Sequence, residues 1–97
     1  MTAYVYAEIE ITDREVYKSG YIPLALTAVS EHGGRFVSTG RHVSKRLGGA
    51  SDARVVMIEF DSFEIANNFY DSAAYRAASI VRERCAITHR YSIVGAE

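Results

Sequence analysis

Two carboxylates and one histidine have the chemistry and the placement that proton transfer requires. Glu8 and Glu59 each fall on the polar side of an alternating run of residues, which places both on the same face of a predicted sheet. Two carboxyl groups within a few ångströms raise one of the two pKa values, which suits proton transfer from a substrate. In the alternative interpretation, each carboxylate pairs with an arginine, such as Arg54 or Arg90, across a dimer. Histidine side chains ordinarily titrate near neutral pH, and His42, in an accessible basic loop, is the third candidate acid or base.

Three further residues are candidates for binding a ligand. Arg35 follows two glycines at the start of a strand, where a guanidinium can clamp a carboxylate through two hydrogen bonds. It can equally pair with a structural acid of the protein. Tyr70 and Tyr75 lie on either side of a predicted helix break and offer two phenol donors to one ligand. Alternatively, their rings belong to the core and their hydroxyls satisfy the broken helix.

Metal and covalent chemistry have no support in the spacing of the sequence. The histidines at positions 32, 42 and 89 lack the paired spacing of a metal site, such as two histidines four residues apart on a helix. Cys85 and Ser79 have no adjacent pattern of histidine and acid, so nucleophilic catalysis is not supported either. We therefore expect no metal and no other cofactor.

Two successive units must position these residues, and both have the order strand, long amphipathic stretch, strand. The expected ranges are 3–11, 13–32 and 35–39 in the first unit, and 54–60, 62–84 and 87–94 in the second. In one domain of 97 residues, this order predicts an α+β fold whose four-stranded antiparallel sheet carries both helices on one face. The other face of the sheet is then uncovered and needs a partner or a ligand.

Local signals predict where the first helix begins, bends and ends. Thr12 and Glu15 have the spacing of a capping box, so the helix is expected to begin after Thr12. Gly20 and Pro23 predict a bend, with the proline in the first turn of the restarted helix. Gly33 predicts the end of this helix, because glycine accepts the left-handed conformation of a C-terminal cap.

The second helix is expected to begin after Ser62 and to break and re-cap around residues 71–72. Beyond the break, a stripe of residues recurs at helical spacing. It consists of Tyr75, Ala78, Ser79 and Arg82.

Composition narrows the range of partners. Eleven basic and twelve acidic residues give a net charge of −1, so no broad positive field is available for nucleic acid or an anionic membrane. No secretory signal or membrane span is recognisable, and the single cysteine is compatible with a reducing compartment. We therefore expect a cytoplasmic protein that binds neither nucleic acid nor membrane.

The sequence resembles the small bacterial proteins of the domain of unknown function 1330 (DUF1330) family over nearly its whole length. The resemblance depends on the order and spacing of several short motifs rather than on any single one. These motifs are Gly33-Gly34-Arg35-Phe36, Leu47-Gly48-Gly49, Glu59-Phe60-Asp61-Ser62, and Tyr70-Asp71-Ser72-Ala73-Ala74-Tyr75 followed by Arg82.

This resemblance implies a ferredoxin-like βαββαβ fold of the dimeric α/β-barrel superfamily, in which two protomers pack their open sheet faces together. Two positions depart from the family pattern. Gly48 stands where the family usually has a glutamate, and the tyrosine pair of the first helix is spread to Tyr17 and Tyr21. Proteins with the same barrel include cofactor-independent monooxygenases, lactone isomerases and haem-degrading enzymes, so the fold permits catalysis without demonstrating it.

Two functions are consistent with the sequence. In the first, the protein binds or transforms a small carboxylated or aromatic metabolite between helices and sheet, with Arg35 binding it and His42 or a carboxylate moving a proton. In the second, it is a non-catalytic homodimer that binds a metabolite or has a structural role. A pocket that contains Arg35, a tyrosine and a histidine favours the first function, whereas a sheet face filled by the partner without a cavity favours the second.

Overall fold

Four strands form one antiparallel sheet in the computed structural model, which describes residues 2–40, 43, 47–48 and 52–96. β1 (Ala3–Ile11) lies between β3 (Arg54–Phe60) and β4 (Ala86–Gly95). The short strand β2 (Arg35–Ser38) pairs with β3 at the edge, which gives the order β2-β3-β1-β4. The prediction of a four-stranded antiparallel sheet is therefore confirmed.

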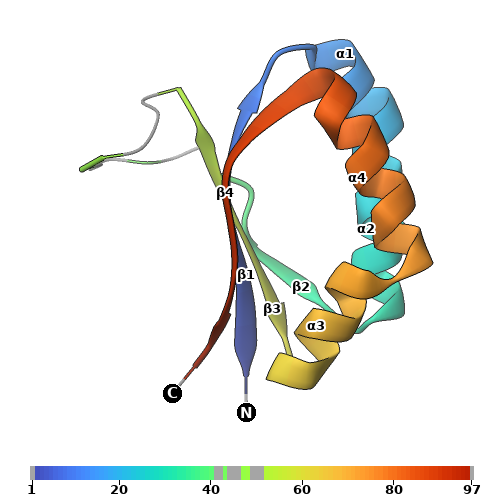
Figure 1. The fold of residues 1–97 in the computed structure, drawn as a ribbon, viewed down its shortest axis with the longest axis vertical. Helices are drawn as coiled ribbons and strands as arrows, with labels where there is room; N and C mark the ends of the chain where they lie inside the picture. The colour runs from blue at the N-terminus through green and yellow to red at the C-terminus, as the bar shows by residue number, and fades with distance from the viewer. Residues whose placement is uncertain (1, 41–42, 44–46, 49–51, 97) are drawn as a thin grey trace.

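The helices form two arms on the same face of this sheet (Figure 1). The first arm contains α1 (Arg14–Val16), the π-helix η1 (Tyr17–Tyr21) and α2 (Ile22–Glu31). The second contains α3 (Phe63–Asp71) and α4 (Ala73–Cys85). This arrangement confirms the α+β fold class with helices on one face, and the element order is that of a ferredoxin-like fold.

Period-two alternation explains why β1 has one buried face. Ala3, Val5, Ala7 and Ile9 point toward the helices and are almost completely buried. The intervening residues point to the other face, which no described helix covers and which we call the open face. Register places the following side chains of β1 and β3 on the open face: Tyr4, Tyr6, Glu8, Glu10, Val55, Met57 and Glu59.

The first helix begins one residue later than the sequence predicted. Asp13 is the N-cap, and its side chain accepts a hydrogen bond from the backbone N–H of Val16 at 3.2 Å. The predicted cap Thr12 was wrong, because the Asp13 carboxylate takes the backbone N–H that a cap accepts, and the backbone N–H groups of both residues donate to the Cys85 carbonyl, at 2.8 Å from Thr12 and 3.1 Å from Asp13.

The predicted bend near Gly20 takes the form of the π-helix η1. A Cβ atom on Gly20 would lie 3.2 Å from a methyl group of Val81, so glycine allows α4 to pack closely against this segment. Pro23 lies in the first turn of α2, as predicted. The wider turn leaves Tyr17 and Tyr21 both buried on the side that faces the sheet.

The remaining helix boundaries agree with the local signals. The Ser62 and Ser72 hydroxyls accept hydrogen bonds from the backbone N–H groups of Ile65 and Tyr75, so α3 and α4 are each capped as predicted. Gly33 follows α2 with a φ of 67°, the conformation expected after a helix end.

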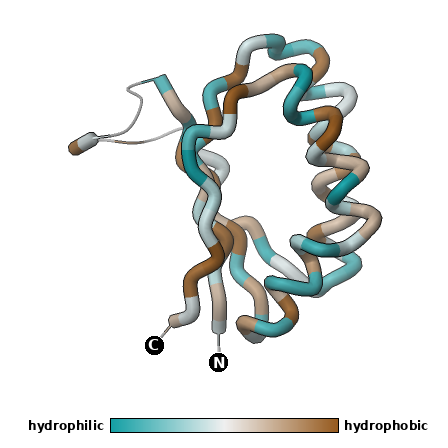
Figure 2. The backbone as a smooth tube through the Cα atoms, in the orientation of Figure 1, coloured by the Kyte–Doolittle hydropathy of each residue, from teal (hydrophilic) through white to brown (hydrophobic). Residues whose placement is uncertain are grey.

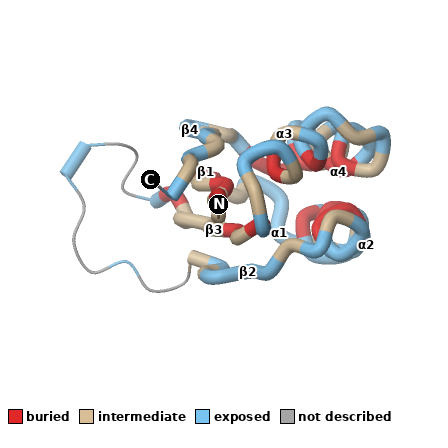
Figure 3. The backbone as a smooth tube through the Cα atoms, turned by 90° about the horizontal axis from the view of Figure 1, so that it is seen from below, coloured by how far each residue is buried: buried red, intermediate tan, exposed pale blue. Residues whose placement is uncertain are grey.

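Amphipathic patterning decides how the two arms pack. Hydrophobic and hydrophilic residues follow one another along the helices (Figure 2). The buried residues of α2 and α4 lie on the sides where the two helices face each other (Figure 3). Phe60 and Phe69 are fully buried and join β3 to α3 at the centre of the core.

Candidate functional site

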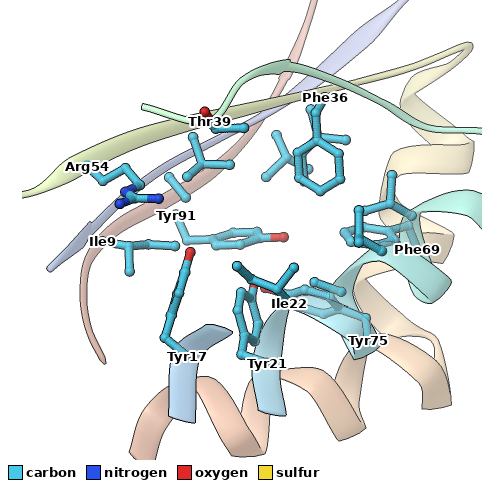
Figure 4. Close-up of a pocket in the computed structure, with 17 residues that line it drawn as sticks. Ile9, Tyr17, Tyr21, Ile22, Phe36, Thr39, Arg54, Phe69, Tyr75 and Tyr91 are labelled. Atoms are coloured by element: carbon cyan, nitrogen blue, oxygen red, sulfur yellow. The ribbon is translucent and has the colours of Figure 1, made fainter. Parts of the chain in front are cut away.

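A cavity of about 140 Å³ lies between the helices and the buried face of the sheet (Figure 4). Its described walls contain mostly aliphatic and aromatic side chains. We call it the tyrosine cavity because four tyrosines from three elements contribute to it: Tyr17, Tyr21, Tyr75 and Tyr91.

Each of these tyrosines is positioned by a break in regular structure. Tyr17 and Tyr21 belong to η1, and their ring centroids lie 5.0 Å apart. Tyr75 lies in the first turn of α4, directly after the break that Ser72 caps. These irregular segments bring the phenols of both helical arms to one place above the sheet.

Tyr91 reaches the cavity from β4 because of a change in strand register. Tyr91 pairs with Ala7, and the register shifts between Glu8 and Ile9, so that Ile87 lies opposite Glu10 on the open face. Figure 4 shows the Tyr91 ring extending across the cavity with its hydroxyl toward the middle. This hydroxyl is buried and has no hydrogen-bond partner among the described residues.

Arg82 lies behind the tyrosines and is 6% exposed. It donates a hydrogen bond to the Tyr75 hydroxyl, and its guanidinium carbon lies 5.5 Å from the ring centroids of both Tyr75 and Tyr91. The ring centroid of Tyr21 is 5.9 Å away. No carboxylate of the described residues lies within ion-pairing distance of this arginine.

The electrostatics of the cavity are those of neutral phenols beside a permanent cation. Burial raises the pKa of Tyr21 and of Tyr91 well above the ordinary value, so both remain protonated near neutral pH. Burial opposes the charge of Arg82, but the nearby oxygens of Tyr75 and Tyr21 hold its pKa above the ordinary range. The phenols are therefore hydrogen-bond donors, and the arginine keeps its charge.

A second cation, Arg54, lies at the other side of the cavity from Phe69 (Figure 4). Its guanidinium carbon is 5.9 Å from the ring centroid of Tyr17, and its side chain is partly exposed. Leu26 and Phe36 also line the cavity and are 51% and 39% exposed, so they mark its contact with solvent between α2 and β2.

The candidate ligand-binding residues predicted from the sequence lie in different places. Tyr75 lines the tyrosine cavity. Tyr70 packs beside it, with 5.7 Å between the two ring centroids, but it is 48% exposed and is not part of the cavity wall. Arg35 lies on the open face and donates hydrogen bonds to Glu59 Oε1 from Nε at 2.9 Å and from Nη2 at 2.5 Å.

The candidate acids and bases are not brought together among the described residues. Glu59 is bound by Arg35 and by the Tyr4 hydroxyl, and the Arg35 hydrogen bonds lower its pKa. Glu8 pairs with Val55 in register whereas Glu59 pairs with Tyr4, so the two glutamates are four positions apart. At about 3.3 Å per residue, this offset separates them by roughly 13 Å along the sheet.

Glu8 has its own arginine partner, and the position of His42 is not described. The Glu8 carboxylate accepts a hydrogen bond from the Tyr6 hydroxyl at 3.0 Å and lies 3.8 Å from Arg90 Nε. This is the arginine pairing considered as an alternative for Glu8, here formed within one chain. His42 lies outside the described residues.

The described residues contain no group of three or more histidine, cysteine, aspartate or glutamate side chains placed to hold a metal ion. Among the described helices, none combines the length and the apolar character needed to cross a bilayer.

Sequence reasoning missed four of the residues that form the site. A signal existed for Arg82, because an arginine in the same helical stripe as Tyr75 and Ala78 is expected to be buried with them. The predicted break at Gly20 was a signal for Tyr17 and Tyr21, because both tyrosines lie next to it. Nothing in the sequence of β4 revealed the register shift that turns Tyr91 toward the cavity.

Comparisons with known proteins agree with this fold and assign no activity. The family model described as "Domain of unknown function (DUF1330)" matches residues 2–96. The crystal structure of RPA0582, a protein of unknown function from Rhodopseudomonas palustris, has a TM-score of 0.69 at 15% identity, covering 99% of this chain and 82% of that one. The structure of methylated RPA0582 gives a TM-score of 0.72 at 14% identity, with 99% and 81% coverage. No curated protein matches the chain.

Proposed function

We propose that this chain, which belongs to the DUF1330 family, forms a cytoplasmic homodimer and binds a compact carboxylated or aromatic metabolite in the tyrosine cavity. The observation that carries the proposal is the cavity itself: a mostly apolar space into which phenol hydroxyls from two helical arms and one strand converge, with Thr39 and Arg54 as its other polar lining residues. Ligand sites typically have such walls, with a few convergent polar groups that orient the bound molecule.

The size of the cavity limits the ligand to about one ring. An apolar protein cavity of about 150 Å³ accepts benzene. The tyrosine cavity has nearly this volume, about 140 Å³, and it also contacts solvent near Leu26 and Phe36. We therefore expect a single six-membered ring with one small polar substituent to fit, and two fused rings to exceed the enclosed space.

The chemistry of the walls favours binding over catalysis by proton transfer. A cofactor-independent oxygenase-like or isomerase-like reaction needs a base that can reach the ligand. The described residues that line the cavity include no carboxylate and no imidazole, and burial raises the pKa of Tyr17, Tyr21 and Tyr91. The predicted bases Glu8 and Glu59 lie on the open face, with arginine and tyrosine partners.

Dimerisation is proposed through the open face. A chain of this length buries only about 60–65% of the surface of its extended form, so a second subunit supplies core that one chain lacks. The open face combines exposed apolar side chains with charges of both signs, a composition that can complement itself about a two-fold axis. Its exposed apolar residues include Ile87 and Val94.

Ligand binding is tested by a thermal-shift panel of single-ring acids and neutral analogues, with a fused two-ring acid as the size control. A ligand present at a hundred times its Kd stabilises the folded state by about 2.7 kcal/mol. For a domain of this size, that corresponds to a rise in Tm of roughly ten degrees or more. We expect single-ring compounds to raise Tm and the two-ring acid to leave it unchanged. If no single-ring compound raises Tm, the proposed function is wrong.

Dimerisation is tested by light scattering at micromolar concentration. The expected mass is twice the 10.8 kDa of one chain. Met57→Glu introduces a charge at the middle of the open face and is expected to give a monomer, whereas Leu24→Glu on α2 leaves the dimer intact. A monomeric wild-type protein, or dissociation by both variants alike, would contradict the proposed interface.

A further inference from the structure

We infer that the ligand is an anion whose charged oxygens lie against the Tyr91 and Tyr75 hydroxyls in front of Arg82, so that Arg82 and Tyr91 determine specificity for a negative charge. This inference rests on the proposed function and adds the charge and the orientation of the ligand. It depends on two features of the described residues: a buried cation without an acid, and a buried hydroxyl without a partner.

The buried cation is the first feature. Arg82 is 6% exposed, and transferring an isolated charge from water into a protein interior is costly unless an opposite charge accompanies it. Three aromatic ring faces and the Tyr75 hydroxyl offset part of this cost. They supply no negative charge, and the Nε atom of Arg82 has no hydrogen-bond partner. The described residues therefore place no negative charge beside this buried arginine.

The Tyr91 hydroxyl is the second feature. It is buried without a hydrogen bond of normal geometry, although the Tyr75 hydroxyl lies close enough to raise its pKa as a hydrogen-bonding neighbour. A phenylalanine would avoid the cost of burying an unpaired hydroxyl. An acceptor in the cavity gives this hydroxyl a well-placed partner, and Figure 4 shows the hydroxyl directed there.

Water alone does not account for both features. A bound water molecule can satisfy the Tyr91 hydroxyl, because the cavity is large enough for one and its phenol groups supply polar partners. It leaves the charge of Arg82 uncompensated. A carboxylate or another compact oxyanion supplies the acceptor and the charge together, and hydrogen bonds to ionised groups are the stronger ones.

The two cations of the site are not equivalent. Arg54 is partly exposed, so water solvates its charge and no ligand is needed to compensate it. Arg82 is shielded from water by the tyrosines. We therefore assign the anionic group of the ligand to the end of the cavity at Tyr75 and Tyr91, behind which Arg82 lies, and the ring of the ligand to the aliphatic walls formed by β1, β3 and α2.

The test compares benzoate with benzamide, a neutral analogue of nearly the same shape, by calorimetry at neutral pH. Benzoate is expected to bind about ten- to hundredfold more tightly, the range that one charge-assisted hydrogen bond provides. Tyr91→Phe is expected to weaken benzoate binding by about tenfold or more and to change benzamide binding far less. Its Tm without ligand is expected to equal or exceed that of the wild type.

Three further variants separate charge from structure. Arg82→Met removes the charge and is expected to abolish the preference for benzoate, whereas Arg82→Lys retains a substantial part of it. Tyr70→Phe is the matched control for Tyr91→Phe, because Tyr70 packs 5.3 Å from Tyr91 by ring centroids but lies outside the cavity wall. It is expected to leave both affinities unchanged.

The outcomes distinguish this inference from the function on which it rests. If benzoate and benzamide bind equally well, the charge assignment is wrong although the cavity still binds ligands. If Tyr91→Phe lowers Tm and leaves the preference for benzoate intact, Tyr91 has only a structural role and its assignment is overturned. If no single-ring compound binds the wild type, the proposed function itself fails.

Discussion

Replacing Ala25 with leucine is expected to abolish ligand binding without destabilising the protein. Ala25 is buried in α2 and forms part of the wall of the tyrosine cavity. The larger side chain extends into space that the ligand needs, so benzoate affinity is expected to fall more than a hundredfold. Because filling a cavity adds packing contacts, the free energy of unfolding is expected to stay the same or rise by about 1 kcal/mol.

Ala77→Leu is the matched control for this change. Ala77 lies on α4 with its side chain exposed, so the same substitution adds the same atoms to a helix without entering the cavity. Calorimetric titration should give wild-type affinity for Ala77→Leu and no detectable binding for Ala25→Leu. Wild-type affinity in the Ala25 variant would mean that the ligand binds elsewhere on the protein.

The sheet and its buried face could be predicted because the strands follow local rules. The observed bounds of Ala3–Ile11 and Arg54–Phe60 are the predicted ones, since alternating or β-branched runs fix both strands independently of the rest of the chain. Serine caps likewise act on their own helix ends, so Ser62 and Ser72 were identifiable. The fold class follows from the order of these elements.

The tyrosine cavity could not be predicted because it depends on departures from regular periodicity. Gly20 and Pro23 predict a break in the helix, but they do not distinguish a simple bend from a π-helix. The observed π-helix buries both Tyr17 and Tyr21, and the sequence alone did not predict this. Along β4, strict alternation would place Ile87 and Tyr91 on one side of the sheet. The register shift opposite Glu8 and Ile9 places them on opposite sides.

Judged by chemical type alone, the charged residues of the open face were also the main candidates for a site. Arg35 and Glu59 attract notice in the sequence as a possible anion clamp and a possible base, yet adjacent strands place them side by side as a hydrogen-bonded pair. Arg82 lies in a helical stripe with Tyr75 and is buried. In this chain, the arginine on the apolar stripe of a helix lies beside the cavity tyrosines, whereas the arginine at the strand edge is paired with an acid.

Replacing Phe69 with alanine is expected to cause the largest loss of stability of any substitution considered. Phe69 is fully buried, and its ring centroid lies 4.8 Å from that of Phe60 and 4.6 Å from that of Tyr75. Truncating a buried phenylalanine costs about 3–5 kcal/mol, a large fraction of the roughly 5–15 kcal/mol that stabilises a typical domain. Urea unfolding is expected to show this loss as a lower midpoint with little change in slope.

Phe63→Ala on the same helix is the control, because Phe63 is 49% exposed at the first turn of α3 and its loss is expected to cost less than about 1 kcal/mol. Phe69 also forms part of the cavity wall, so its truncation enlarges the binding space as it weakens the core. A two-ring acid that fails to bind the wild type is therefore expected to bind Phe69→Ala and to restore part of its lost Tm. Equal losses of stability in Phe69→Ala and Phe63→Ala would show that Phe69 is not the centre of this core. If the two-ring acid fails to bind Phe69→Ala, the cavity wall at Phe69 does not set the size limit of the ligand.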